Sequence, residues 1–515
     1  MPPSTIKEMV ENPHWIYKQY AQYWNFLAQS YEGGIDYTQS QVIQSKNSGT
    51  LIDSMFKLFV NGVEQRTIQS GNLFMHPKER AEDYDRRVAM SYYYNLCAPI
   101  IDIYKNHLLK DSVNQDFESI EKQVEPRLED IDNRGSSLEE FRKELSEHIQ
   151  LYGHSYVVVD SLAIAEDNVK TYKDQLDLGA FPYCTIHPPQ SIINWSLDRF
   201  GMPYWVLLRE YDEANAVAEA YDKNKVGSFT YKLWTREYWA RYDSEYKLME
   251  VGLHPVGAVP IVCVYNKRSK KARGFLGISE IADIAFIARD IYNSCSELRQ
   301  ILRDQTFAFL ALEGNASDYS ESIIGTNKGL VYPQGTKTPA YVSPPSDNAQ
   351  TYFNHIDRQV SKCFQLAKLE GGSAAFNGQS AVVQSGVSKA WDFNETNSAL
   401  SEKAANLEDG ELKIWKIYAA WTGQQFDGSI QYPNEFSVST LMDDLNEAEK
   451  IARVNLGKTF IIEVKKAIQK KKFPRASEEE LEKMESELEG VEKENETVSK
   501  MVNRFNFLRN GQPTG

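Results

Sequence analysis

Apolar residues recur at steps of three and four in three long stretches of this chain, residues 279–305, 348–369 and 387–423. A stripe with this spacing predicts an amphipathic helix in each stretch. Ser279 stands at the start of the first stretch and is of a type that caps helices. Gly410 lies inside the third, where a glycine weakens the helix and predicts a kink.

The apolar pattern differs between residues 152 and 265, where short runs of β-branched and aromatic residues alternate with turn-rich segments. These runs predict strands over residues 155–159, 205–208, 229–234, 238–242 and 261–265. Helices are expected before them, over residues 90–110 and 137–151. The sequence therefore predicts a multi-domain α+β fold.

A small insert separates the first two long helices. Residues 306–347 contain three short strand-like runs broken by prolines, which predicts a compact α/β module of its own. The two helices would then extend from the body to this module and back.

A long loop joins the second helix to the third, over residues 370–386. Its first part consists of small, uncharged side chains and one aromatic ring: Gly371, Gly372, Ser373, Ala374, Ala375, Phe376, Asn377, Gly378, Gln379 and Ser380. A loop of this length inside a globular chain is usually functional or disordered. It lacks the Gly-Lys-Ser/Thr ending of a phosphate-binding loop, so a nucleotide site is not expected.

In this order the sequence resembles the portal proteins of tailed bacteriophages. Residues 77–102 are similar to the N-terminal helices of that family, and residues 187–210 to its wing strands. The resemblance implies the following division of the chain: a wing over 1–276, a stem helix over 277–305, a clip over 306–347, a second stem helix over 348–369, a tunnel loop over 370–386, a long kinked helix and return to the wing over 387–438, a helical crown over 439–502 and a flexible tail over 503–515.

The resemblance also implies a function. Portal subunits form a ring of about twelve copies at one vertex of the capsid, and DNA passes through the ring during packaging and ejection. The expected partners are other copies of the chain, double-stranded DNA bound without sequence preference, the terminase large subunit, the major capsid and scaffolding proteins, and head-completion or tail adaptor proteins. The expected location is the virion, and the host cytoplasm during assembly. Residues 371–380 would line the DNA channel.

The charge of the chain bears on how it would meet DNA. The net charge is −15, whereas a conventional nucleic-acid binder presents a basic patch. A channel in which DNA slides should hold phosphates weakly, because every neutralised phosphate strengthens attachment through counterion release. Candidates for weak phosphate contacts are Arg299, Arg303, Arg358 and Lys362; salt bridges between subunits are an equally good interpretation of these four residues.

No catalytic, metal or cofactor site is expected. Residues 130–135 begin like a calcium loop, but Arg134 and Phe141 occupy positions that need oxygen ligands, so a surface turn is predicted. The five cysteines lack disulfide or zinc spacing and predict buried thiols. No stretch has the roughly 18 consecutive apolar residues of a membrane span.

Two alternatives to the portal interpretation remain open. One is another ring-forming phage connector, and the other is a metal-dependent DNA-processing enzyme. Incubation with plasmid DNA and magnesium or manganese separates the enzyme from the two structural classes.

Overall fold

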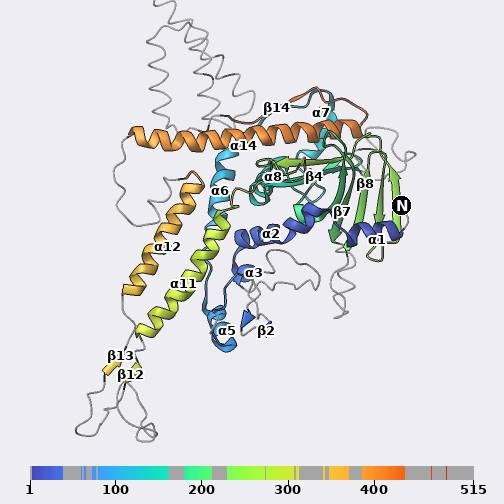
Figure 1. The fold of residues 1–515 in the computed structure, drawn as a ribbon. Coiled ribbons are helices and arrows are strands. Elements are labelled where there is room, and N and C mark those ends of the chain that lie inside the picture. Colours follow the sequence, from blue (N-terminus) through green and yellow to red (C-terminus); the bar gives the residue numbers. More distant parts are fainter. Residues whose placement is uncertain are drawn as a thin grey trace, which may run out of the picture.

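The computed structural model describes residues 3–38, 59–60, 63–64, 72–76, 79–161, 175, 179–211, 229–272, 274–306, 309–311, 340–342, 347–369, 386–434, 436, 466, 483 and 486. Figure 1 shows a body of sheets and helices, a pair of helices that descends from it, and a long helix that lies across its top. The predicted α+β class is confirmed. The predicted crown, apart from three single residues, and the predicted tail lie outside the described residues.

A five-stranded antiparallel sheet forms one side of the body (Figure 1). Its strands follow one another as a meander, in the order β10-β9-β8-β7-β6. Their bounds are Ile192–Leu197 (β6), Pro203–Tyr211 (β7), Phe229–Thr235 (β8), Tyr238–Tyr242 (β9) and Leu248–Leu253 (β10). Helix α1 (Pro3–Glu11) packs on this sheet through Ile6, in a small core with Ile193, Leu207 and Leu233.

A second, three-stranded sheet lies in the centre of the body. Strand β4 (His154–Asp160) runs between β11 (Ile261–Tyr265) and β5 (Tyr183–His187), antiparallel to both. All seven residues of β4 are buried, because helices cover this sheet. The remaining described strand pairs are short: β1 (Phe59–Val60) with β2 (Val63–Glu64), β3 (Asn114–Asp116) with β14 (Ser429–Gln431), and β12 (Phe309–Ala311) with β13 (Ala340–Val342).

Helices pack on the central sheet and share one large apolar core with it. They include α2 (Trp15–Glu32), α6 (Cys97–Leu108) and α8 (Leu138–Tyr152). Helix α8 occupies the predicted range, and its first turn is held by a reciprocal capping box between Ser137 and Glu140. Shorter helices surround these: α3 (Gly34–Thr38), α5 (Ala81–Met90), α7 (Glu121–Val124), and the 3-10 turns η1 (Glu118–Ile120), η2 (Glu125–Arg127) and η4 (Pro189–Ser191).

Helix α14 (Gly386–Trp421) lies across the top of the body in Figure 1. Its 36 residues correspond to about 54 Å at helical rise. The helix continues through Gly410 without a break, and the kink expected at this residue stays a prediction. Gly410 allows close packing: a Cβ atom at this position would lie 2.6 Å from Cγ1 of Val264 on β11.

Helices α11 (Ile284–Thr306) and α12 (Asp347–Leu366) form the descending pair. They pack along each other, and β12 and β13 lie beyond their lower ends (Figure 1). Ile284, Ala288 and Ile291 on α11, with Cys363 and Phe364 on α12, enter the main core. The pair is therefore anchored in the body at its upper end.

Two helix starts differ from the sequence prediction. The helix expected from residue 90 begins at Cys97, because the Asn95 side chain accepts the backbone N–H groups of Cys97 and Ala98 and so starts α6 there. Helix α11 begins at Ile284 and not at Ser279. The Ser279 hydroxyl donates to the carbonyl of Leu151 at 2.6 Å, which ties it to the end of α8.

Candidate functional site

The predicted tunnel loop is attached where α12 ends and α14 begins. After α12 the chain turns at Lys368, whose φ of 53° is left-handed. The hydroxyl of Thr396 on α14 donates to the carbonyl of Lys368 at 2.5 Å. Residues 386–395 of α14 precede this contact and correspond to about 15 Å of helix. The candidate channel residues 371–380 lie outside the described residues.

Polar contacts fix α12 against α11 below this point. The Tyr352 hydroxyl donates to Oε2 of Glu297 at 2.6 Å. On α11, Oδ2 of Asp290 lies 3.0 Å from Nε2 of His355 and accepts a hydrogen bond from Nε2 of Gln359 at 3.1 Å. These contacts hold the two helices at a fixed register.

The four candidate phosphate contacts fall into two separate groups. Arg358 and Lys362 are exposed on α12. Arg299 and Arg303 lie on the opposite face of α11 from the α12 contacts, because Arg299 follows Asp290 by nine residues, or about 180° around the helix. The four residues therefore do not form one continuous stripe within a subunit.

Arg299 and Arg303 line a cavity of about 220 Å³ between α11 and α5. It is lined by Arg87, Met90, Ser91, Ser296, Arg299, Gln300 and Arg303. Arg299 is exposed and donates to the carbonyl of Met90. This contact is within the subunit and joins α11 to the end of α5.

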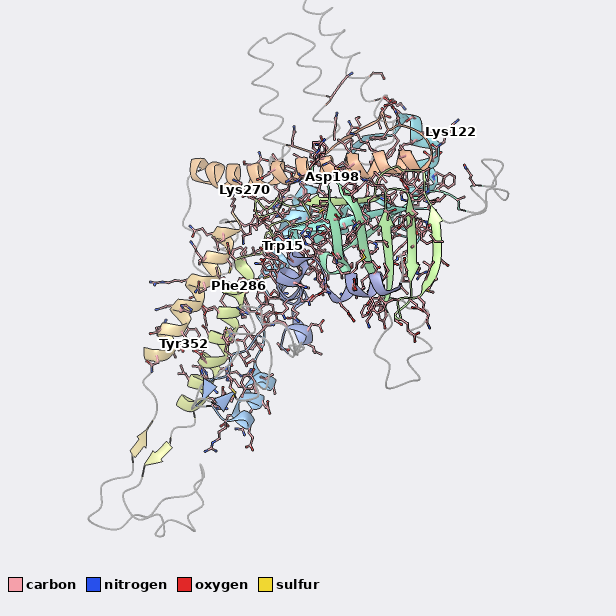
Figure 2. The ribbon with its side chains drawn as sticks, turned by 45° about the vertical axis from the view of Figure 1, so that its right-hand side comes forward. Trp15, Lys122, Asp198, Lys270, Phe286 and Tyr352 are labelled. Carbon is pink, nitrogen blue, oxygen red and sulfur yellow. The ribbon has the colours of Figure 1, made fainter. Side chains whose placement is uncertain are left out.

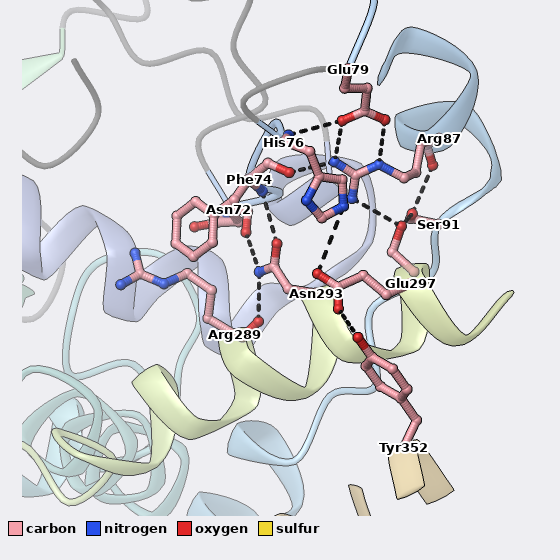
Figure 3. Close-up of polar contacts among 11 residues, drawn as sticks. Asn72, Phe74, His76, Glu79, Arg87, Ser91, Arg289, Asn293, Glu297 and Tyr352 are labelled. Carbon is pink, nitrogen blue, oxygen red and sulfur yellow. Dashed lines mark hydrogen bonds and ion pairs between the residues drawn. The ribbon is translucent and has the colours of Figure 1, made fainter. Parts of the chain in front are cut away.

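A buried ion pair ties α5 to the residues just before it, beside α11 (Figure 3). Arg87 and Glu79 are 3% and 7% exposed, and Nη2 of Arg87 lies 2.8 Å from Oε2 of Glu79. Burial alone would raise the pKa of Glu79, but the hydrogen bonds from Arg87 and from the His76 backbone outweigh it and lower that pKa. Arg87 also contacts Ser296 on α11 at 3.3 Å.

Asn293 completes this attachment. Its Oδ1 accepts the backbone N–H of Phe74 at 2.8 Å, and its Nδ2 donates to the carbonyl of Asn72 at 3.0 Å (Figure 3). Buried polar groups satisfied in this way fix one relative position of two elements. Figure 3 shows that residues 72–76 and 79–91, α11 and Tyr352 of α12 form one connected polar network.

The calcium-loop-like segment and the cysteines have structural roles. Residues 130–135 form the predicted turn, in which Asp130 accepts from Gly135 and Asp132 from Arg134. All five cysteines are free thiols, three of them buried. Within the described residues, no group of three or more His, Cys, Asp and Glu side chains could hold a metal ion.

Sequence reasoning missed one charged feature. The loop after β11 carries four exposed cations within five residues: Lys267, Arg268, Lys270 and Lys271. The signal was present in the sequence as the run Lys-Arg-Ser-Lys-Lys, in a chain that is otherwise acidic. In Figure 2, Lys270 lies on the side of the body where α2 meets α11.

Comparisons with known proteins give likenesses in structure only. No family model matches the sequence, and no curated protein matches it. No helix among the described residues is long and apolar enough to cross a membrane.

Solved structures similar to the chain include three from gene transfer agent particles. One, described as the virion of a native gene transfer agent particle, has 12% identity and a TM-score of 0.37, and the match covers 70% of this chain and 85% of that one. A chain from the neck of the empty particle, computed with C6 symmetry, has 12% identity, a TM-score of 0.38 and coverages of 71% and 86%. A chain from the neck of the native particle, computed with C12 symmetry, has 12% identity, a TM-score of 0.35 and coverages of 70% and 86%. These likenesses in fold are partial, so the function proposed below is argued from the helices and strands of this chain.

Proposed function

We propose that this protein is a portal subunit: a non-enzymatic structural protein that forms a ring of about twelve copies at one capsid vertex. The ring serves as the channel for genome packaging and ejection. It is the docking platform for the terminase large subunit and then for head-completion or tail adaptor proteins. It meets the major capsid and scaffolding proteins around its outer edge, and its location is the virion.

One observation carries this proposal. The chain leaves its α+β body along α11, makes a small β-strand pair, returns along α12, and then enters a 36-residue helix across the body. This order supports a stem–clip–stem arrangement followed by a tunnel loop and a long helix. In that arrangement, residues 306–347 form the clip that meets terminase or connector, and residues 371–380 line the channel.

The fixed geometry of the helix pair also supports the proposal. A stem must keep its shape while DNA moves past it, and polar contacts join α11 to α12, to residues 72–74 and to Arg87 of α5. Arg299, Arg303, Arg358 and Lys362 are proposed as weak phosphate contacts in a channel of this kind. The exposed positions of Arg299, Arg358 and Lys362 leave these side chains accessible.

Electron microscopy of the purified protein tests the proposal. Negative-stain images should show rings with a central channel, and native mass spectrometry should give an assembly of about twelve chains. A protein that stays monomeric or dimeric under all assembly conditions would contradict the proposal. Cleavage of plasmid DNA in the presence of magnesium or manganese, lost in a variant of an acidic residue, would favour the enzymatic alternative.

A further inference from the structure

A groove of about 730 Å³ opens on the side of the body where α2 meets the loop before α11. Trp15, Tyr20 and Tyr23 of α2 form one wall, and Leu276 and Ile278 form the other. Trp15 is 55% exposed and Ile278 42% exposed. These large apolar side chains therefore face solvent in the isolated subunit.

An aromatic surface continues from the groove along α11. The ring of Tyr23 lies 6.3 Å from that of Phe286, which in turn lies 5.1 Å from that of Phe26. The guanidinium of Arg289 lies over three rings, those of Phe26, Phe74 and Phe286, at 4.8, 5.3 and 5.1 Å. Phe286 is 45% exposed and Phe74 43% exposed. We call the surface formed by Trp15, Tyr20, Tyr23, Phe26, Phe74, Phe286 and Arg289 the aromatic ledge.

The aromatic ledge has the composition and the length of a protein interface. Trp, Tyr, Phe and Arg are the side chains enriched in interface centres and in binding hot spots. Helix α2 alone contributes 18 residues, or about 27 Å at helical rise. Contiguous exposed apolar patches of this kind mark interaction sites on soluble proteins.

The lysines around the groove indicate which partner binds there. Lys18 and Lys271 line the groove, and Lys270 lies beside it. The whole chain carries −15, so the surface of another copy is on balance acidic and complements this rim. In a closed ring each subunit meets its neighbours through two different surfaces, so a surface such as this one receives an unlike face of the next copy.

We propose that the aromatic ledge and its groove form one half of the contact between adjacent copies of this chain. The inference rests on the proposed ring and specifies which surface closes it. Trp15, Ile278 and Phe286 provide the apolar centre of the contact, and Lys18 and Lys271 pair with carboxylates of the neighbour. Figure 2 shows Trp15 and Phe286 on the same side of the body, away from the outer strands of the five-stranded sheet.

The structure offers controls of the same kind of substitution on a distant surface. Leu253 on β10 is 84% exposed, and Lys247 beside β10 forms a surface ion pair with Glu245, with the two side chains 71% and 70% exposed. Strand β10 is at the opposite edge of its sheet from β6, the strand nearest α2. Four strand spacings separate these edges, or about 19 Å.

The test compares assembly of the full chain with that of four variants by native mass spectrometry and analytical ultracentrifugation. Trp15→Ser with Ile278→Ser removes apolar contact, and Lys18→Glu with Lys271→Glu reverses the rim charge. Leu253→Ser and Lys247→Glu are the respective controls. We expect the first two variants to raise the concentration needed for ring formation at least tenfold, and the charge-reversal effect to shrink as salt rises. Circular dichroism melting identifies a variant whose subunit is unfolded, in which case the other variant decides.

Each outcome has one meaning. Wild-type rings together with unassembled ledge variants and assembled controls would support the inference. Rings formed equally well by the wild type and by both folded ledge variants would overturn the inference and leave the proposed ring intact. A wild-type chain that forms no rings would overturn the proposed function itself, and the inference with it.

Discussion

His154 is fully buried in β4, and burial lowers its pKa to about 3. Its Nδ1 accepts the backbone N–H of Gly277 at 3.2 Å, a role that only the neutral ring can fill. The same histidine in the unfolded chain takes up a proton near pH 6.5. The stability associated with His154 is therefore complete above pH 6.5 and is lost progressively as the pH falls toward 3.

The lowered pKa of His154 predicts a measurable pH dependence of stability. Between pH 7.5 and pH 5.0, His154 should remove about 2 kcal/mol from the free energy of unfolding. His154→Gln, which cannot titrate, should show a smaller drop in the thermal midpoint over that interval, whatever its stability at pH 7.5. The two midpoints are measured in the same buffers by differential scanning calorimetry. Equal drops in the wild type and the variant would contradict the assignment.

Gly410 provides a second prediction at this scale. Alanine normally strengthens a helix by about 1 kcal/mol relative to glycine. Here its methyl group would lie 2.6 Å from a Cγ atom of Val264, a buried β-branched residue with little freedom to move. Overpacking of this kind costs about 1–3 kcal/mol, so Gly410→Ala should lower the thermal midpoint. Adding Val264→Ala to Gly410→Ala should cost less than Val264→Ala costs in the wild type.

The elements of the body are joined by buried ion pairs, of which Arg142 on α8 and Glu411 on α14 is the clearest. Their side chains are 6% and 5% exposed, and Nη2 lies 2.6 Å from Oε1. Glu411→Gln would leave Arg142 buried without a counter-charge, which costs about 3–5 kcal/mol. The exposed pair Lys413–Asp409, on the same helix, is the control, and Asp409→Asn should change stability by less than about 1 kcal/mol. Similar losses in both variants, measured by urea unfolding, would contradict this ranking.

The tunnel-loop prediction also belongs to the scale of elements. Replacing residues 373–384 with a Gly-Ser linker of equal length should leave the thermal midpoint within a few degrees of the wild type, because the helices on either side are held by their own core contacts. DNA packaging or retention should fail when the variant subunit supplies the portal in assembling particles. A large fall in the thermal midpoint would instead assign these residues to the core, and the channel assignment would be wrong.

Helices and strands with a long buried face were easier to predict from the sequence than elements without one. The stripes of α11 and α12 are one-sided and long, and the buried apolar residues of α14 from Leu400 to Ala419 recur mostly at steps of three and four, so periodicity located all three helices. Strand β10 was missed because its residues are mostly exposed on both faces, which leaves no alternation to detect. The start of α6 was misplaced because one side chain, Asn95, decided it. The partners of Arg142 and Lys403 come from distant parts of the chain, and no local pattern specifies such pairs.

At the scale of the whole molecule, charge decides how the protein meets DNA. The net charge of −15 per chain is multiplied twelvefold in the proposed ring, which repels a polyanion approaching from outside. The exposed cations described above are few, and the candidate phosphate contacts lie in two separate groups on α11 and α12. Such contacts neutralise few phosphates, so both the affinity and its dependence on salt should be modest.

Linear double-stranded DNA should therefore bind assembled rings weakly and without sequence preference, and binding should fade further as salt rises. Arg358→Gln on α12 should change translocation or assembly more than equilibrium affinity for DNA. Lys413→Gln, on the distant part of α14, is the control, because it also removes one positive charge. Gel-shift titrations at several salt concentrations, with two unrelated DNA sequences, measure both properties. Tight, sequence-selective binding at physiological salt would contradict the conduit mechanism, because it requires base contacts from a recognition surface that a sliding channel must lack.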